Sequence, residues 1–212
     1  MPGPRLRDFI EAHTRKAPDA AALVAPGRSA ISYATVLDHL RTTGRHLRNL
    51  GANRRDRVAL VIPDGPEAVT AFLVVSDQAT AAPVNPAYRQ SEYETYFTTV
   101  GVTALVTALT AGSPADAAAR SLGLPIIRLV IAEAQPAGMF TLDGPERAPA
   151  LDGDDEPDVA LILTTSGTTS RPKVVPLTHA NLCNSAANIA ASLDLTASDR
   201  CFGIMPLFHV HG

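Results

Sequence analysis

Four short runs of apolar residues recur between residues 58 and 131, each separated from the next by a segment with helical periodicity. Apart from Thr107 and Arg128 the runs are apolar instead of alternating with polar residues, which is typical of strands buried on both faces of a sheet. Repeated strand–helix units place such strands in parallel, with helices over both faces. The sequence therefore predicts an α/β fold whose mostly parallel sheet is covered by helices. The strands are predicted at residues 58–62, 81–84, 104–107 and 126–131, and the helices between them at residues 67–76, 90–100 and 114–122.

The residues before this alternation predict two more helices and a hairpin. Residues 6–16 and residues 36–50 each repeat apolar side chains at helical spacing. The second helix is expected to end at Gly51, because glycine favours the position just past a helix. Two short apolar runs, at residues 21–25 and 29–33, flank a Pro-Gly turn and predict a hairpin.

The composition excludes several classes of protein. The 212 residues are 46% hydrophobic and 18% charged, with a net charge of −3 at pH 7, which is typical of a globular protein. The basic residues form no cluster of the kind that binds nucleic acid, and Arg54-Arg55 beside Asp56 indicates a solvated turn. No apolar stretch approaches the ~20 residues of a membrane span, and the N-terminus lacks the apolar segment of a secretory signal. We therefore expect a cytoplasmic protein with no membrane span and no nucleic-acid partner.

Residues 143–158 differ from the rest of the chain because they combine prolines with a run of acidic residues. Such runs are usually solvated, so an exposed linker is preferred to a metal site. We place a boundary here: residues 1–150 are expected to form a first α/β subdomain, and residues 151–212 to begin a second, truncated one.

After the linker, residues 159–163 and 174–177 predict two strands on either side of a hydroxyl-rich segment. Thr178 is suited to cap a helix that runs to about residue 193. Residues 201–205 predict a last strand, in which Cys201 is expected to be buried.

The segment with the most chemical content runs from Thr164 to Lys173 and reads Thr-Thr-Ser-Gly-Thr-Thr-Ser-Arg-Pro-Lys. Gly167 permits backbone angles closed to other residues, and successive N–H groups in such a loop can bind an anion. The hydroxyls donate further hydrogen bonds to phosphate oxygens, and Lys173 adds a positive charge. A flexible linker of serine and threonine is the plain alternative. The pattern of a Walker loop is absent, because the second glycine and the hydroxyl residue after the lysine are missing.

Thr165-Ser166-Gly167-Thr168-Thr169 followed by Pro172-Lys173 resembles the phosphate loop of the adenylate-forming superfamily. This superfamily includes acyl-CoA synthetases, 4-coumarate–CoA ligases, luciferases and peptide-synthetase adenylation domains. The chain departs from the pattern at Ser170 and Val174, where the family usually has glycine. The resemblance implies the N-terminal portion of the large domain of these enzymes. Other segments resemble the family in the family's own order, namely Ile31-Ser32-Tyr33, Asp56-Arg57-Val58, residues 79–86 and residues 206–212.

The resemblance also implies the roles of particular residues. Lys173 and the neighbouring hydroxyls would hold the β- and γ-phosphates of ATP, and Mg²⁺ would bridge phosphate oxygens without a metal ligand from this chain. His209 would lie near the acyl pocket and the reacting carboxylate, so Lys173 and His209 are the candidate catalytic residues. A metal site at His209 and His211 is the weaker alternative, because no third ligand is apparent. The implied nucleotide-binding residues are Thr165, Ser166, Gly167, Thr168, Thr169, Ser170 and Lys173.

The activity implied is that of an ATP-dependent ligase that forms an acyl-adenylate and then transfers the acyl group to coenzyme A. Ser170-Arg171-Pro172-Lys173 most resembles the oxalate–CoA ligase branch, which indicates a small carboxylic acid such as oxalate. The magnesium, ribose and catalytic-lysine motifs of the family would lie beyond residue 212. The chain alone is therefore expected to be inactive and to self-associate through exposed apolar surface. Two alternatives stay open: a non-catalytic phosphate-binding fragment, and an adenylation domain that loads a carrier protein.

Overall fold

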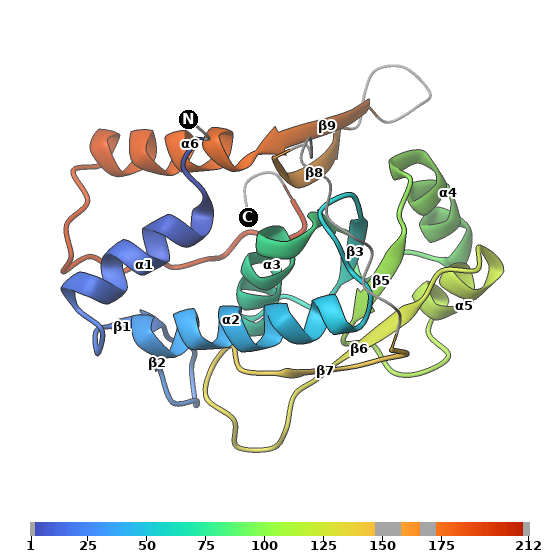
Figure 1. The fold of residues 1–212 in the computed structure, drawn as a ribbon, viewed down its shortest axis with the longest axis horizontal. Coiled ribbons are helices and arrows are strands. Elements are labelled where there is room, and N and C mark those ends of the chain that lie inside the picture. Colours follow the sequence, from blue (N-terminus) through green and yellow to red (C-terminus); the bar gives the residue numbers. More distant parts are fainter. Residues whose placement is uncertain (1–2, 147–157, 166–172, 210–212) are drawn as a thin grey trace.

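The computed structural model describes residues 3–146, 158–165 and 173–209 (Figure 1). Helices and strands alternate along most of the chain, as the sequence predicts. The helices are α1 (Leu6–Lys16), α2 (Tyr33–Asn49), α3 (Pro66–Gln78), α4 (Gln90–Val100), α5 (Pro114–Ser121) and α6 (His179–Ser192). The strands are β1 (Ala21–Leu23), β2 (Ile31–Ser32), β3 (Arg57–Val61), β4 (Thr80–Pro83), β5 (Ala104–Thr107), β6 (Ile126–Val130), β7 (Thr141–Asp143), β8 (Val159–Thr165) and β9 (Lys173–Thr178).

Seven of the described strands form one sheet in the order β7-β6-β5-β3-β4-β8-β9. The five central strands, from β6 to β8, run parallel to one another, whereas β7 and β9 pair antiparallel with β6 and β8 at the two edges. The predicted α/β fold with a mostly parallel sheet is therefore confirmed. The predicted hairpin also forms, as an antiparallel pair of β1 and β2 outside this sheet. The subdomain boundary predicted at residue 150 falls outside the described residues and stays a prediction.

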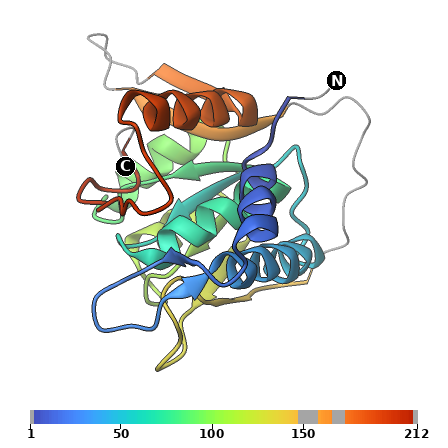
Figure 2. The ribbon, with the colours of Figure 1, turned by 90° about the vertical axis from the view of Figure 1, so that its left-hand side faces the viewer.

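The buried side chains of β3 alternate between the two faces of the sheet. Val58 and Leu60 belong to a core cluster with α2 and α3, whereas Ala59 and Val61 belong to a second cluster with α4 and α5. Both faces of this strand are thus apolar, which is why it reads as an uninterrupted apolar run in the sequence. Figure 2 shows α6 at one edge of the molecule, beside the pair of strands β8 and β9.

Local capping explains where several helices begin. The Ser32 hydroxyl accepts a hydrogen bond of 3.2 Å from the backbone N–H of Thr35 at the start of α2. The Thr178 hydroxyl accepts one of 3.1 Å from the N–H of Asn181 at the start of α6, as predicted. Helix α2 is followed by Gly51 with a φ of 92°, which suits the glycine predicted there.

The structure differs from the sequence prediction in two places. The short edge strand β7 was not predicted, because three residues with Leu142 alone buried give no periodic signal. Residues 201–205 form no strand, and Cys201 is exposed where burial was predicted. An apolar run becomes a strand only where a neighbour pairs with its backbone. The side chains of Phe202 and Ile204 are 81% and 76% exposed instead.

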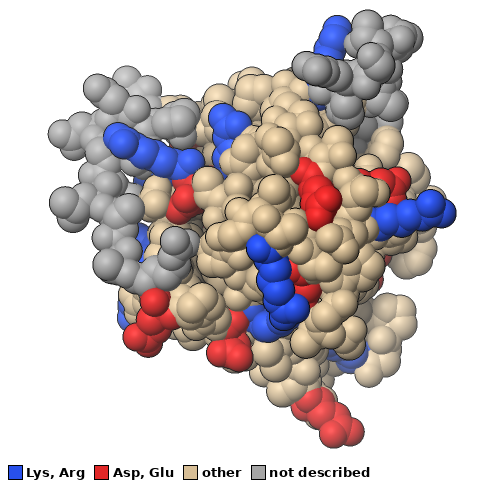
Figure 3. Space-filling model, turned by 90° about the vertical axis from the view of Figure 1, so that its right-hand side faces the viewer, with Lys and Arg blue, Asp and Glu red and all other residues tan. Residues whose placement is uncertain are grey.

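Acidic and basic side chains are interspersed on the face of the molecule shown in Figure 3. Among the described helices, none combines the length and apolar character needed to cross a membrane. The predicted self-association is untested and stays a prediction. The exposed apolar side chains near α6 that would support it are Ile189, Leu193, Leu195, Phe202, Ile204 and Met205.

His39 of α2 predicts a pH dependence of folding. Its ring lies edge-on to Phe140, 4.6 Å between centroids, and is 3% exposed. Burial outweighs the nearby charge of Asp38 and lowers the pKa of His39 below its ordinary value of 6.5. The unfolded chain therefore binds the proton more tightly, so the stability contributed by neutral His39 is complete above pH 6.5 and is lost as the pH falls.

We expect urea unfolding of the His39→Gln variant to depend less on pH than that of the unaltered protein, by up to about 1 kcal/mol per unit between about pH 5 and 6.5. The matched control is His46→Gln in the same helix, because His46 is exposed. Equal pH slopes for the two variants would contradict the prediction.

Candidate active site

The candidate phosphate loop joins two paired strands. β8 ends at Thr165 and β9 begins at Lys173, and these two residues lie directly opposite each other in the antiparallel pair. Both side chains are exposed. The structure therefore brings the two described ends of the predicted loop together. The other predicted loop residues, Ser166, Gly167, Thr168, Thr169 and Ser170, lie outside the described residues, and their roles stay predictions.

The loop follows the carboxyl end of a parallel strand. β8 pairs in parallel with β4 through Ala81 and Leu161, so it ends at the same edge of the sheet as β3 and β4. Ligands of open α/β sheets bind outside the carboxyl ends of the strands. Thr165 and Lys173 are therefore at the edge where a ligand is expected.

An apolar cavity of about 280 Å³ lies at this edge. It extends from the ends of β3, β4 and β8 to α1, α3 and α6. His209 is the only described lining residue with a polar side chain. The lining residues are Leu6, Leu60, Ile62, Ala68, Val69, Phe72, Pro83, Leu161, Leu163, Leu182, Leu207, Phe208 and His209.

One face of the β8–β9 pair carries both the cavity wall and the loop ends. Leu161, Leu163 and Thr165 are spaced two apart along β8, so their side chains share a face of the strand. Lys173 is paired directly with Thr165, and opposed residues of antiparallel strands project to the same side. The hydroxyl of Thr165 and the ammonium group of Lys173 are therefore on the cavity side of the pair.

A backbone contact holds the segment that carries His209. The N–H of Leu207 donates a hydrogen bond of 2.8 Å to Oδ1 of Asp64, which lies between β3 and α3. The N–H of His209 donates to the carbonyl of Pro206 over 3.0 Å and closes a turn. Asp64 was missed in the sequence, although a carboxylate just after a strand at the ligand-binding edge is a usable signal.

The metal-site alternative for His209 gains no support within the described ranges. No group of three His, Cys, Asp or Glu side chains in these ranges is arranged to hold a metal ion. His211 lies outside them. The described polar groups at this edge include a lysine, a threonine hydroxyl and a histidine, which suit oxyanions, and the carboxylate of Asp64 accepts the hydrogen bond from the N–H of Leu207.

Comparison with known proteins agrees with this geometry. The family model described as AMP-binding enzyme matches residues 10–212. The chain is 36% identical over 219 residues to an oxalate–CoA ligase of Arabidopsis thaliana, covering 100% of this chain and 42% of the relative. It is 35% identical over 201 residues to a probable CoA ligase, CCL9, of Humulus lupulus, covering 92% of this chain and 38% of the relative.

A solved structure supports the fold independently. A long-chain-fatty-acid–CoA ligase of Archaeoglobus fulgidus matches with a TM-score of 0.78 at 23% identity, covering 99% of this chain and 44% of that chain. The chain thus spans between 38% and 44% of the length of these relatives. Because the family model matches nearly the whole length of this chain, the chain belongs to the AMP-binding enzyme family.

Proposed function

We propose that the chain is part of an ATP-dependent, AMP-forming acyl-CoA ligase. The observation that carries the proposal is the position of Thr165, Lys173 and an apolar cavity lined in part by His209 at the same carboxyl edge of the sheet. The relatives are named as CoA ligases, which favours the same reaction. The chain covers less than half of their length, so the activity belongs to a longer protein that contains residues 1–212.

The proposed reaction has two steps. A carboxylate oxygen attacks the α-phosphorus of ATP. The bond between the α-phosphorus and the oxygen that bridges to the β-phosphorus breaks, and pyrophosphate leaves. The thiol of coenzyme A then loses its proton and attacks the acyl carbon of the adenylate, and AMP leaves. The first step brings two anions together, so its catalysis depends on positioning and on neutralising charge.

The described residues fit the phosphate end of this reaction. Lys173 supplies a positive charge and Thr165 a hydroxyl, and both project from the same face of the strand pair. We propose that they bind the β- and γ-phosphates with the hydroxyls of residues 166–170, and that Mg²⁺ enters bound to ATP. His209 would orient the carboxylate at the mouth of the cavity. A cytoplasmic location is part of the same proposal.

Two properties distinguish the ligase from its alternatives. One is whether the isolated chain catalyses the reaction, and the other is whether the acyl group is transferred to coenzyme A or to a carrier protein. If the 212-residue chain is a phosphate-binding fragment, it binds ATP without forming an adenylate. If the longer protein loads a carrier protein, it forms the adenylate but releases no acyl-CoA when CoA is added. Calorimetric titration of the chain with ATP, and thioester formation by the longer protein, separate these cases from the ligase.

The substrate is proposed to be a small carboxylic acid, with oxalate the first candidate. This proposal rests on the loop residues Ser170 and Arg171 and on the oxalate–CoA ligases among the relatives. The apolar cavity favours a second candidate, a medium-chain aliphatic acid, because oxalate has no apolar part to fill about 280 Å³.

We expect oxalate to stimulate ATP–pyrophosphate exchange by the longer protein about tenfold or more above the rate without acid. The measurement compares kcat/KM across oxalate, malonate, octanoate and 4-coumarate. A higher kcat/KM for octanoate than for oxalate would make octanoate the proposed substrate and would leave the ligase proposal unchanged. Exchange that responds to none of a broad panel of acids would overturn the ligase proposal.

A further inference from the structure

Among the described strands, the β8–β9 pair joins the sheet through β4 alone, and the backbone ladder between β4 and β8 is short. β3 and β4 are paired at four positions, whereas β4 and β8 are paired at Ala81 and Leu161 alone. One side-chain hydrogen bond, 3.0 Å from the Thr80 hydroxyl to the carbonyl of Val159, adds to this pairing. Side-chain contacts add to this short ladder in fixing the orientation of the pair.

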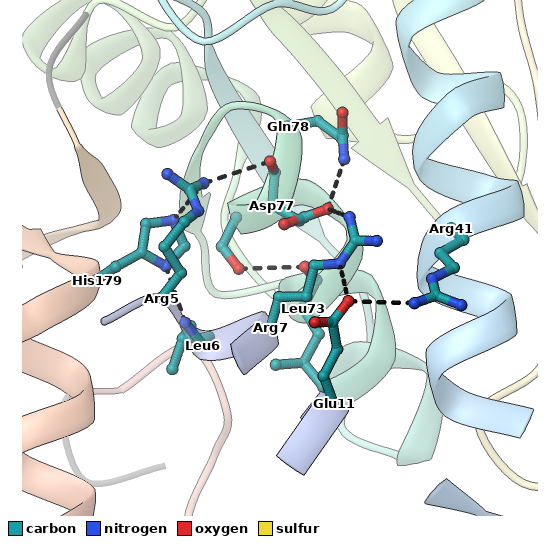
Figure 4. A network of polar contacts seen from close by, with 10 residues as sticks. Arg5, Leu6, Arg7, Glu11, Arg41, Leu73, Asp77, Gln78 and His179 are labelled. Atoms are coloured by element: carbon teal, nitrogen blue, oxygen red, sulfur yellow. Dashed lines mark hydrogen bonds and ion pairs between the residues drawn. The ribbon is translucent and has the colours of Figure 1, made fainter. Parts of the chain in front are cut away.

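The guanidinium group of Arg5, just before α1, supplies such contacts at the end of the pair away from the candidate loop. Nη1 of Arg5 lies 2.6 Å from Oδ1 of Asp158, the residue just before β8. Nη2 lies 2.9 Å from Nε2 of His179, the residue just after β9, and 3.5 Å from the carbonyl oxygen of Asp77 near the end of α3. Figure 4 shows Arg5 reaching between His179 and Asp77. One side chain therefore joins both strands, at the end of the pair away from the loop, to α3.

The histidine in this cluster faces a donor at each ring nitrogen, Nη2 of Arg5 at 2.9 Å from Nε2 and the N–H of Leu6 at 3.4 Å from Nδ1, and a neutral ring accepts from one of them. His179 is 2% exposed, and burial, followed by the charge of Arg5, lowers the pKa of its ring. A neutral ring offers an acceptor nitrogen, whereas a protonated ring offers none. Its backbone N–H also donates to the carbonyl of Asp158 over 3.1 Å. Asp158 and His179 are thus tied to each other as well as to Arg5.

We propose that Arg5 is a positioning residue that sets the orientation of the β8–β9 pair, and through it the presentation of Lys173 to phosphate. Val159 is paired with Thr178 at the end that Arg5 contacts, and Thr165 is paired with Lys173 at the opposite end. A tilt of the pair at the first end therefore moves Lys173 at the second. The catalytic part of this inference rests on the proposed function, and the structural part does not.

Arg7, in the first turn of α1, provides a matched control for Arg5, the residue just before that helix. It forms ion pairs of 3.1 Å with Asp77 and with Glu11, so it also joins α1 to α3 (Figure 4). Its side chain is 31% exposed and that of Arg5 is 23% exposed. These ion pairs reach α1 and α3 but not β8, β9 or α6. Methionine at either position keeps much of the aliphatic stem and removes the charge.

The first test is hydrogen exchange in the full-length protein without nucleotide. We expect Arg5→Met to speed exchange of the backbone N–H groups of β9, which Pro176 lacks, about tenfold, the factor for losing one charged hydrogen bond, while exchange in α4 and β5 is unchanged. Arg7→Met is expected to leave residues 173–178 unchanged. Equal acceleration by both variants, or none by Arg5→Met, overturns the proposal. These outcomes do not depend on whether the protein is a ligase.

The second test separates positioning from general stability. In ATP–pyrophosphate exchange, Arg5→Met is expected to raise the KM for ATP about fivefold, and to raise it much less in a Lys173→Ala background. Arg5→Lys is expected to restore part of the effect by keeping the contact with Asp158. Equal effects of Arg5→Met in both backgrounds overturn the link to Lys173. Loss of ATP dependence in every variant would instead contradict the proposed function.

Discussion

Replacing Arg128 of β6 by methionine is expected to lower the free energy of unfolding by about 3–5 kcal/mol, because it leaves the buried carboxylate of Asp116 without its ion-pair partner. Asp116 of α5 is 0% exposed and forms an ion pair with Arg128. It also accepts hydrogen bonds from the N–H of Gly112 at 2.8 Å and from the hydroxyl of Ser113 at 3.2 Å. The backbone and hydroxyl donors alone do not balance the charge.

The pH dependence of the Arg128→Met variant gives the prediction a second measurement. Burial alone would raise the pKa of Asp116, but the hydrogen bonds from Arg128 and Gly112 outweigh it and leave the pKa below its ordinary value of 3.8. In the unaltered protein this carboxylate therefore stabilises the fold above pH 3.8, and the stability is lost as the pH falls. Without Arg128 the folded-state pKa rises, so the deficit of the variant should shrink as the pH is lowered.

A matched control is available on the same carboxylate. Nη2 of Arg120 lies 3.9 Å from Oδ2 of Asp116, and its side chain is 64% exposed. Arg120→Met should therefore cost less than about 1 kcal/mol in urea unfolding at pH 7. Similar losses for the two variants would contradict the assignment of the buried pair to Arg128.

Much of the fold could be predicted from the sequence, because its central strands are apolar on both faces. Helices α1 and α4 and strand β5 have the predicted bounds. Local signals of this kind do not report pairing. Residues 201–205 have strand composition, but no described strand pairs with them, and the antiparallel direction of β9 depends on how the chain turns after Thr165.

The candidate site also has one part that could be predicted from the sequence and another that could not. The position of Lys173 at a strand boundary was predictable, because glycine and hydroxyl residues follow a buried strand. Arg5 and His179 are 174 positions apart, and nothing in the local sequence of either indicates the other. Such contacts follow from the packing of α1 against α6, which only the structure reveals.

Lys173 is where a single substitution should most affect the proposed reaction. Lys173→Ala in the longer protein is expected to reduce ATP–pyrophosphate exchange by about tenfold or more, the loss expected for removing one charged hydrogen-bond donor. The side chain is exposed at the start of β9, so the variant should fold normally. The loss would then report on phosphate binding and not on stability.

The matched control is Lys16→Ala, because Lys16 is also exposed but lies in the last turn of α1. Lys173→Arg tests charge against geometry: a guanidinium keeps the positive charge but replaces a compact ammonium by a planar fork. Partial activity of Lys173→Arg would indicate that charge neutralisation contributes most of the effect. If Lys173→Ala folds and exchanges pyrophosphate at the rate of Lys16→Ala, the phosphate contact is made by other residues, and the role given to Lys173 is wrong.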